Sequence, residues 1–342
     1  MRKIWTCRPH LFFLVWLLLT PFAVTAQTLE PPFDSDFSLL DLGPVPGLPE
    51  SFGGLFILPG EPNTLYISGN ANESNGALYS IGLVRDGAGL ITGFSGSATQ
   101  VAPAPFNDGG IGPDPGGLIS FVQWPENAYG QIDLSSGTVV NTIDLDPLGI
   151  VSASTTLGFI PAGFPGAGGM RIASWSGGEY YVVDFSVGGG GIISISSATQ
   201  VTTLPGGPTG LAYVPQGSAQ FPNPSFLLSE FSDDSVAAYE MDAQGDPVLA
   251  SRRVFISNLS GALGAAIDPE TGSFLFSTFG GGDRVLVVSG GFVAPPPPQP
   301  PAPPGEGNTN AEPIPTLGGW FTLLMALALV LIGIVFNPRR VT

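Results

Sequence analysis

Histidine, cysteine and lysine are nearly absent from this chain of 342 residues. Each occurs once, as Lys3, Cys7 and His10, close to the amino terminus. Beyond residue 10 the chain therefore offers no nucleophilic cysteine, no Ser-His-Asp triad, no Schiff-base lysine, no disulfide and no histidine ligand for zinc or iron. Any chemistry there rests on carboxylates, hydroxyls, amides, tyrosines and a few arginines.

The first 26 residues have the pattern of a secretory signal peptide. Basic residues at positions 2, 3 and 8 precede an apolar run over residues 11–19, and Val24-Thr25-Ala26 supplies the small residues of a cleavage site. An uncleaved anchor is the alternative, but this apolar run is short for a membrane span. We expect export, removal of residues 1–26 and a mature chain that starts at Gln27.

Positive charge is scarce in the rest of the chain. Between Glu30 and Glu312 five arginines stand against all 27 acidic residues, a formal charge of −22. Such a surface repels nucleic acid and anionic lipid, so its electrostatic ligands would be metal cations or cationic partners. Acidity that serves solubility alone is the other interpretation. We expect no nucleic-acid partner.

The carboxyl-terminal segment, residues 314–342, combines a short motif, an apolar run and a basic end. The motif is Ile314-Pro315-Thr316-Leu317, the uncharged run covers residues 320–336, and Arg339 and Arg340 follow. As a helix this run is about 25 Å long, slightly less than the ~30 Å hydrocarbon core of a membrane. The arginine pair favours a cytoplasmic end. We expect a single transmembrane helix.

This order of features resembles the IPTL-type carboxyl-terminal sorting signal of Gram-negative bacteria. In that family an exosortase-like membrane enzyme cuts the tail and passes the protein to the cell surface. The resemblance implies export through the inner membrane, anchoring by the tail helix before processing, and release to the cell surface or the extracellular space. Gly318-Gly319 is also similar to rhombosortase-type tails, so the identity of the processing enzyme is left open. A transmembrane anchor that is never cut is a further alternative.

A proline-rich segment, residues 294–313, precedes this tail. It contains Pro295-Pro296-Pro297-Pro298 and Pro300-Pro301. Such a composition favours extended polyproline II and cannot pack a core, so we interpret the segment as a stiff spacer.

Residues 27–293 repeat themselves. Ser97-Ala98-Thr99-Gln100-Val101 recurs as Ser197-Ala198-Thr199-Gln200-Val201. The two copies lie 100 residues apart, which is twice a unit of about 50 residues. A period of about 50 residues is typical of propellers and solenoids. Five candidate units begin with apolar strands at Leu55, Ile111, Leu157, Leu211 and Ala266.

Short strands rich in β-branched and aromatic residues, with 49 glycines in the chain, predict an all-β fold. Four-stranded blades around an axis fit best, which gives a β-propeller of five blades, with six as the alternative count. We expect an early strand at residues 37–42 to complete the last blade. A β-sandwich or two smaller β domains are the alternative folds. Gly207-Pro208-Thr209-Gly210-Leu211-Ala212-Tyr213 and residues 227–241 resemble NHL and SMP-30-like propellers.

In four of the five units the second strand ends at an aromatic residue. These residues are Trp124, Trp175, Phe231 and Phe279. We expect them to offer apolar faces to sugar rings or to the side chains of a partner. Packing in the core is the competing interpretation.

The resemblance to SMP-30-like lactonases implies where a metal would bind. In that family acidic and asparagine side chains hold a divalent metal at the channel mouth, and the matching positions here are Thr209 and Leu263, which are poor ligands. Three carboxylate pairs remain as weak candidates for Ca²⁺ or as plain turn residues: Asp144 with Asp146, Asp233 with Asp234, and Asp108 with Asp114. We expect no cofactor, and we leave open whether Ca²⁺ binds.

Together these features predict an exported, surface-displayed propeller that acts as a non-enzymatic binding or structural module of the cell envelope or extracellular matrix. A polysaccharide or an envelope protein is the expected partner. The alternative is a metal-dependent propeller hydrolase or lactonase that uses carboxylates alone.

Overall fold

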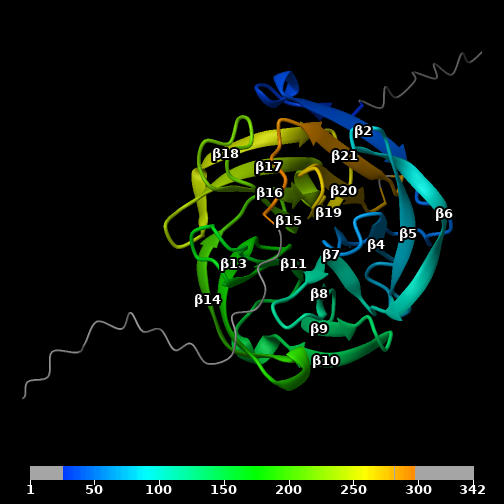
Figure 1. Cartoon of the computed structure of the whole chain (residues 1–342). Helices are drawn as coiled ribbons and strands as arrows, with labels where there is room; N and C mark the ends of the chain where they lie inside the picture. The colour runs from blue at the N-terminus through cyan, green and yellow to red at the C-terminus, as the bar shows by residue number, and fades with distance from the viewer. Residues whose placement is uncertain (1–25, 281, 297–342) are drawn as a thin grey trace, which may run out of the picture. The chain divides into compact units, whose positions relative to one another are not determined.

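The computed structural model describes residues 26–280 and 282–296, which form a ring of five antiparallel sheets. Figure 1 views this ring along its axis. The predicted all-β propeller of five four-stranded blades is confirmed, and the five sheets contain all the strands of the described residues.

Each blade runs from an inner strand to an outer one, as follows. Blade 1 contains β3 (Leu55–Ile57), β4 (Thr64–Gly69), β5 (Ala77–Arg85) and β6 (Ile91–Pro103). Blade 2 contains β7 (Asn107–Pro113), β8 (Ile119–Gln123), β9 (Ala128–Asp133) and β10 (Thr138–Asp144). Blade 3 contains β11 (Ser154–Phe159), β12 (Met170–Ser174), β13 (Glu179–Val187) and β14 (Ile193–Thr203).

Two strands from the amino-terminal segment join the last two blades. Blade 4 contains β15 (Pro208–Val214), β16 (Ser225–Glu230), β17 (Ser235–Met241) and β18 (Pro247–Ser257), with β1 (Thr28–Leu29) as an extra outer strand. Blade 5 contains β19 (Ala262–Ile267), β20 (Phe274–Thr278), β21 (Val285–Gly290) and, outermost, β2 (Phe37–Gly43). The short 3-10 helices are η1 (Phe33–Ser35), η2 (Asp146–Leu148), η3 (Gly189–Gly191) and η4 (Phe231–Asp233).

The ring closes because β2, from the start of the fold, pairs antiparallel with β21, from its end. The register places Phe37 opposite Gly290 and Leu40 opposite Val287. This is the closing strand that the sequence predicted at residues 37–42. The additional strand β1 beside β18 was not expected.

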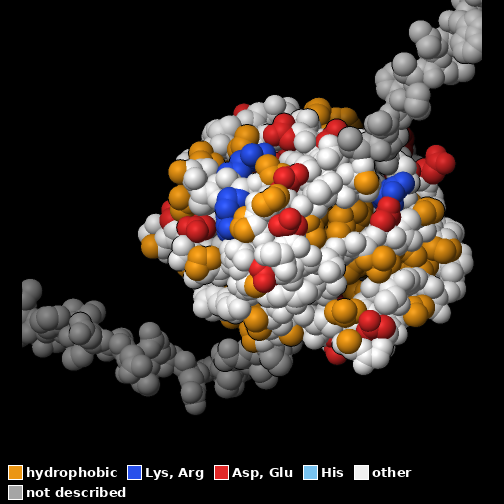
Figure 2. Space-filling model, turned by 90° about the horizontal axis from the view of Figure 1, so that it is seen from above, with side chains coloured by type: hydrophobic (Ala, Val, Ile, Leu, Met, Phe, Trp, Pro, Cys, Tyr) orange, Lys and Arg blue, Asp and Glu red, His pale blue; other side chains and the backbone are white. Residues whose placement is uncertain are grey.

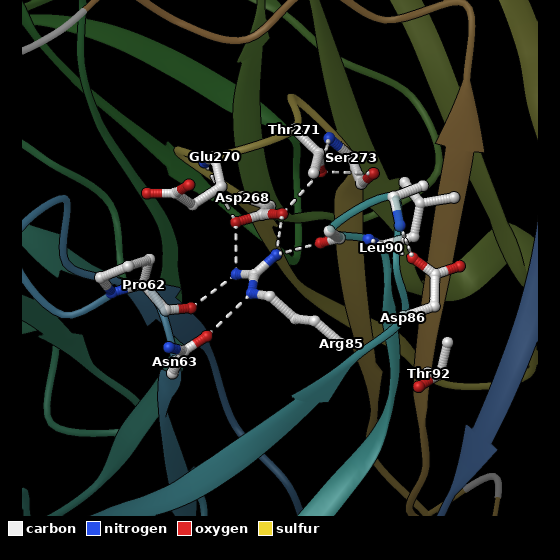
Figure 3. Close-up of polar contacts among 12 residues, drawn as sticks. Pro62, Asn63, Arg85, Asp86, Leu90, Thr92, Asp268, Glu270, Thr271 and Ser273 are labelled. Atoms are coloured by element: carbon white, nitrogen blue, oxygen red, sulfur yellow. Dashed lines mark hydrogen bonds and ion pairs between the residues drawn. The ribbon is translucent and has the colours of Figure 1, made fainter.

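A buried ion pair also joins the first and last blades (Figure 3). Arg85, at the end of β5, donates to both carboxylate oxygens of Asp268, over 2.7 and 2.8 Å. Its remaining N–H groups donate to the carbonyls of Pro62 and Gly89 and to the Asn63 side chain. The Asp268 side chain is fully buried. The pair is therefore a buried, charged and hydrogen-bonded contact between the two blades at which the ring closes.

The hydrophobic core lies between the blades. Alternate residues of a strand face opposite sides of its sheet, so Leu55 and Ile57 pack toward blade 5 while Phe56 packs toward blade 2. Five apolar clusters result, one at each interface between neighbouring blades. The cluster between blades 4 and 5 is rich in phenylalanine, including Phe33 and Phe255 at 4.9 Å between ring centroids.

Glycines let the inner strands approach one another closely around the axis. A Cβ atom on Gly210 would lie 2.3 Å from the backbone nitrogen of Ala265, and one on Gly54 would lie 2.3 Å from the Gly109 carbonyl oxygen. Strand β7 also contacts β15 and β19 across the axis. The middle of the ring is therefore packed with backbone, and open space remains toward its mouth.

Several sequence expectations lie outside the described residues. These are the signal peptide, most of the proline-rich spacer, the motif Ile314-Pro315-Thr316-Leu317, the transmembrane helix and the Arg339-Arg340 end. Within residues 26–280 and 282–296 no helix is long and apolar enough to cross a membrane.

Candidate functional site

A pocket of about 350 Å³ opens at one mouth of the ring, and we call it the mouth pocket. Its walls come from the starts of inner strands and from the residues that directly follow second strands. Because neighbouring strands in a blade are antiparallel, these positions all lie at the same end of the axis. All five blades contribute to the lining.

The four aromatic residues singled out in the sequence all line the mouth pocket: Trp124, Trp175, Phe231 and Phe279. We call them the aromatic rim. Neighbouring rings meet along the rim with centroids 6.5, 6.3 and 6.2 Å apart and interplanar angles of 84°, 81° and 59°. All four side chains are half-buried, and none belongs to the five core clusters. Their contact with a ligand stays a prediction.

Blade 1 interrupts this rim with polar groups. Where the other blades carry an aromatic residue after the second strand, β4 is followed by Asn70 and the buried Ala71. Asn72 and Glu73 then line the mouth pocket, together with Ser51 and Asp108. The mouth pocket thus has an aromatic wall from blades 2 to 5 and a polar wall from blade 1, which Asp108 of blade 2 extends.

Asp108 is the buried carboxyl group of this polar wall. Its side chain lies at the start of β7 and is 2 % exposed. One carboxylate oxygen accepts a hydrogen bond from the Gly109 N–H over 2.6 Å, and with its amide nitrogen turned toward Asp108 the Asn72 side chain donates to the other over 2.7 Å. Burial outweighs these bonds and raises the pKa of Asp108 from 3.8 to about 7. A carboxyl group in a pocket with such a pKa is typical of functional sites.

Thr155, Thr209 and Leu263 are buried residues near the starts of inner strands and line the mouth pocket. Thr209 and Leu263 thus lie at the channel mouth, where the resemblance to lactonases places metal ligands. The Thr209 hydroxyl lies 3.1 Å from the carbonyl oxygens of both Ser229 and Ala262, and the Thr155 hydroxyl donates to the Pro208 carbonyl over 2.6 Å. Both hydroxyl protons are therefore engaged by backbone.

Two of the candidate metal pairs, Asp144 with Asp146 and Asp233 with Asp234, lie outside the mouth pocket and have other partners. Asp144 is exposed and accepts a hydrogen bond from the Asp146 N–H, while Asp146 accepts one from Asn127. Asp233 lies 3.5 Å from Arg252, and Asp234 accepts a hydrogen bond from the Gly261 N–H.

Asp108 and Asp114 lie at opposite ends of β7, so they do not form a pair. Within the described ranges no group of three or more His, Cys, Asp or Glu side chains is placed to hold a metal ion.

The five arginines of the described residues are all engaged away from the mouth pocket. Arg85, Arg171, Arg252 and Arg284 form ion pairs with Asp268, Asp246, Glu230 and Asp41, respectively. The Arg253 guanidinium lies 4.9 Å from the ring centroid of Phe33. On the side of the ring shown in Figure 2, arginines and carboxylates lie scattered among uncharged side chains. No arginine lines the mouth pocket, so Glu73 and Asp108 have no basic neighbour in its walls.

A second hollow of about 430 Å³ shares Trp175 with the mouth pocket, and we call it the side groove. It is lined by the turns after β12 and β14, including Gly177, Gly206 and Gly207. A Cβ atom on Gly207 would lie 2.8 Å from the Trp175 ring, so glycine leaves room for the indole there. Trp175 therefore stands between two adjoining hollows.

Sequence reasoning did not single out Ser51, Asn72 and Glu73. The signal was present, because the first unit is the one whose second strand lacks an aromatic residue at its end. The first unit breaks the repeated aromatic position, and it supplies polar side chains to the mouth pocket instead.

The chain matches no family model and no curated protein. Among solved structures it is similar to a carbohydrate-active enzyme of family AA12 from Trichoderma reesei, with a TM-score of 0.48 and 9% identity over 78% of this chain and 98% of that chain. It is also similar to a streptogramin B lyase, with a TM-score of 0.40 and 12% identity over 75% of this chain and 98% of the other.

A third similar structure is an auxiliary nutrient binding protein from Bacteroides ovatus, with a TM-score of 0.42 and 11% identity over 74% of this chain and 76% of that chain. At these distances no function passes from these proteins to this chain.

Proposed function

We propose that this protein is an exported, surface-displayed β-propeller that binds a polysaccharide in its mouth pocket without altering it chemically. The aromatic rim around a pocket with one polar wall is the observation that carries this proposal. Apolar faces of sugar rings pack against aromatic side chains, and sugar hydroxyls donate hydrogen bonds to carboxylates and accept them from amides. Trp175, Asn72 and Glu73 supply groups of these kinds.

The display part of the proposal rests on the two ends of the chain. A leader at residues 1–26 directs export, and the tail at residues 314–342 is the substrate of an exosortase-like membrane enzyme. The spacer at residues 294–313 holds the propeller away from the membrane before processing. The module then belongs to the cell envelope or the extracellular matrix, where an envelope protein is the alternative ligand.

Tryptophan fluorescence tests the binding site directly. A fragment spanning residues 26–296 contains two tryptophans, Trp124 and Trp175, and both line the mouth pocket. Titration with a panel of bacterial polysaccharides should give a saturable change in emission. Trp175→Ala should weaken binding about five- to thirtyfold, because loss of one aromatic stacking face costs on the order of 1–2 kcal/mol.

The matched control is Tyr79→Ala, which removes a half-buried aromatic side chain of β5 outside the mouth pocket. It should leave the affinity unchanged. If no polysaccharide produces a saturable signal, the proposed function is wrong.

Asp108 supports one alternative, a propeller hydrolase or lactonase that uses carboxylates alone. A carboxyl group with a pKa near 7 can exchange a proton with a substrate at neutral pH. Turnover of a lactone or ester in the presence of Ca²⁺, lost in Asp108→Asn, would establish this enzyme and replace the binding function. We expect no turnover above the rate of that variant.

A further inference from the structure

We propose that the ligand of the mouth pocket carries an organic ammonium group, and that the polysaccharide is therefore one with free amino groups on its sugars. This inference rests on the proposed function and adds the charge of the ligand to it. Three features of the described residues carry it.

The first feature is a set of acidic side chains without a basic partner in the pocket. Glu73 and Asp108 are the two ionisable side chains in the lining of the mouth pocket. Each of the five described arginines is bound elsewhere, in an ion pair or against an aromatic ring. A cation on the ligand therefore supplies the counter-charge that Glu73 lacks, and its approach favours the ionised form of Asp108.

The second feature is the aromatic rim itself. Cations are attracted to the faces of aromatic rings, most strongly to tryptophan, and aromatic enclosures of this kind take alkylated ammonium groups. Neighbouring rings of the rim meet at 59° to 84°, so they are not stacked face to face. Two of the four rings are the indoles of Trp124 and Trp175.

The same lining argues against a metal ion as the occupant. Ca²⁺ prefers six to eight oxygen ligands and Mg²⁺ near-octahedral oxygen geometry. The mouth pocket contributes two carboxyl groups, and Asp108 already accepts hydrogen bonds from Gly109 and Asn72. An ammonium group needs fewer oxygen contacts than a metal ion and uses the aromatic faces, so it fits this lining better.

The third feature is the side groove, which favours a polymer over a small amine. It adjoins the mouth pocket at Trp175 and is lined by turns that include the exposed Gly177 and the half-buried Gly206. A chain of sugars can place one amino sugar in the mouth pocket and the next ones over Trp175 along the side groove.

Calorimetry on the full-length protein in detergent tests this inference with a matched pair of ligands. The probes are a β-linked glucosamine hexamer and the N-acetylglucosamine hexamer, which differ only in the charge and acetylation of their amino groups. At pH 7 the glucosamine hexamer should bind at least about tenfold more tightly, equivalent to about 1.4 kcal/mol. Tetramethylammonium chloride should compete with it better than sodium chloride does at the same ionic strength.

Two variants assign this preference to the mouth pocket. Glu73→Gln changes an exposed side chain and Asp108→Asn keeps the shape of a buried one, and each should reduce the preference for the charged hexamer. Glu270→Gln removes the same charge from an exposed side chain outside the mouth pocket and should leave the preference intact.

The outcomes separate the two proposals. Equal binding of both hexamers overturns the ammonium inference while polysaccharide binding stands. Binding of a lysine-rich peptide with no binding of either hexamer overturns polysaccharide binding and favours a protein ligand. An unchanged preference in both Glu73→Gln and Asp108→Asn overturns the assignment to the mouth pocket.

Discussion

At the scale of single residues, Asp108 combines a carboxyl group with nearly complete burial. Its hydrogen bonds to Gly109 and Asn72 favour the charged form, but loss of water contact favours the neutral form more strongly. In the folded protein its pKa is about 7, whereas the unfolded value is 3.8. The folded state therefore binds one proton more than the unfolded state between these two values.

This difference predicts how stability changes with pH. Because the folded state holds the extra proton, the contribution of Asp108 to stability is greatest below pH 4 and is lost as the pH rises toward 7. Asp108→Asn keeps a neutral side chain at every pH, so its melting temperature should exceed that of the wild type at pH 8. Circular dichroism melts at pH 5 to 8 measure the difference.

The control for this prediction is Glu270→Gln, an exposed carboxyl group. Its melting curve should follow that of the wild type. If Asp108→Asn and the wild type lose stability in parallel between pH 5 and 8, Asp108 is ionised throughout and the account of its burial is wrong.

At the scale of strands and blades, ring closure depends on contacts between distant parts of the chain. Arg85 and Asp268 meet across the junction of blades 1 and 5. Arg85→Met leaves the fully buried carboxylate of Asp268 without its partner, and such a loss costs about 3–5 kcal/mol. Urea unfolding should show that the free energy of unfolding of the variant is lower by this amount.

The pair between Arg284 and Asp41 provides the comparison, because it joins the residue directly before β21 to β2 within blade 5. Its side chains are 30 % and 34 % exposed, so Arg284→Met should cost at most about 1 kcal/mol. If the free energy of unfolding decreases by a similar amount in the two variants, the buried pair does not stabilise ring closure more than the exposed pair does.

The elements of the fold followed from local pattern. Leu55, Leu157 and Leu211 lie in inner strands as expected, since apolar runs bounded by proline and glycine carry the repeat. The closing strand β2 was also predictable, because the last unit lacked a fourth strand. The strand β1 was not, since its two residues carry no pattern of their own.

The polar side of the site was harder to predict than its aromatic side. The aromatic rim follows from one position repeated in four blades, so Trp124 and Trp175 could be picked from the sequence. Asp108 and Glu73 belong to neighbouring blades and line the same pocket only once blade 1 has packed against blade 2. Sequence reasoning paired Asp108 with Asp114 because they are close in the chain, but β7 separates them.

In the whole molecule, we propose that the two ends of the chain direct the transport of the propeller. The motif and apolar run of the tail predict that the protein recovered from the cell surface lacks residues 323–342. Intact-mass analysis of surface-released protein should show this loss, and removal of residues 314–317 should prevent it. The full tail in protein released from a strain with an active sorting enzyme would contradict the prediction.

Binding of a polysaccharide in the mouth pocket can be seen in a crystal structure of the fragment spanning residues 26–296 with a saturating glycan oligomer. We predict a sugar ring against Trp124 or Trp175, with polar atoms of the ligand in hydrogen-bond contact with Glu73 or Asp108. A glycan bound at another place on the ring, with the mouth pocket free of it, would contradict the account.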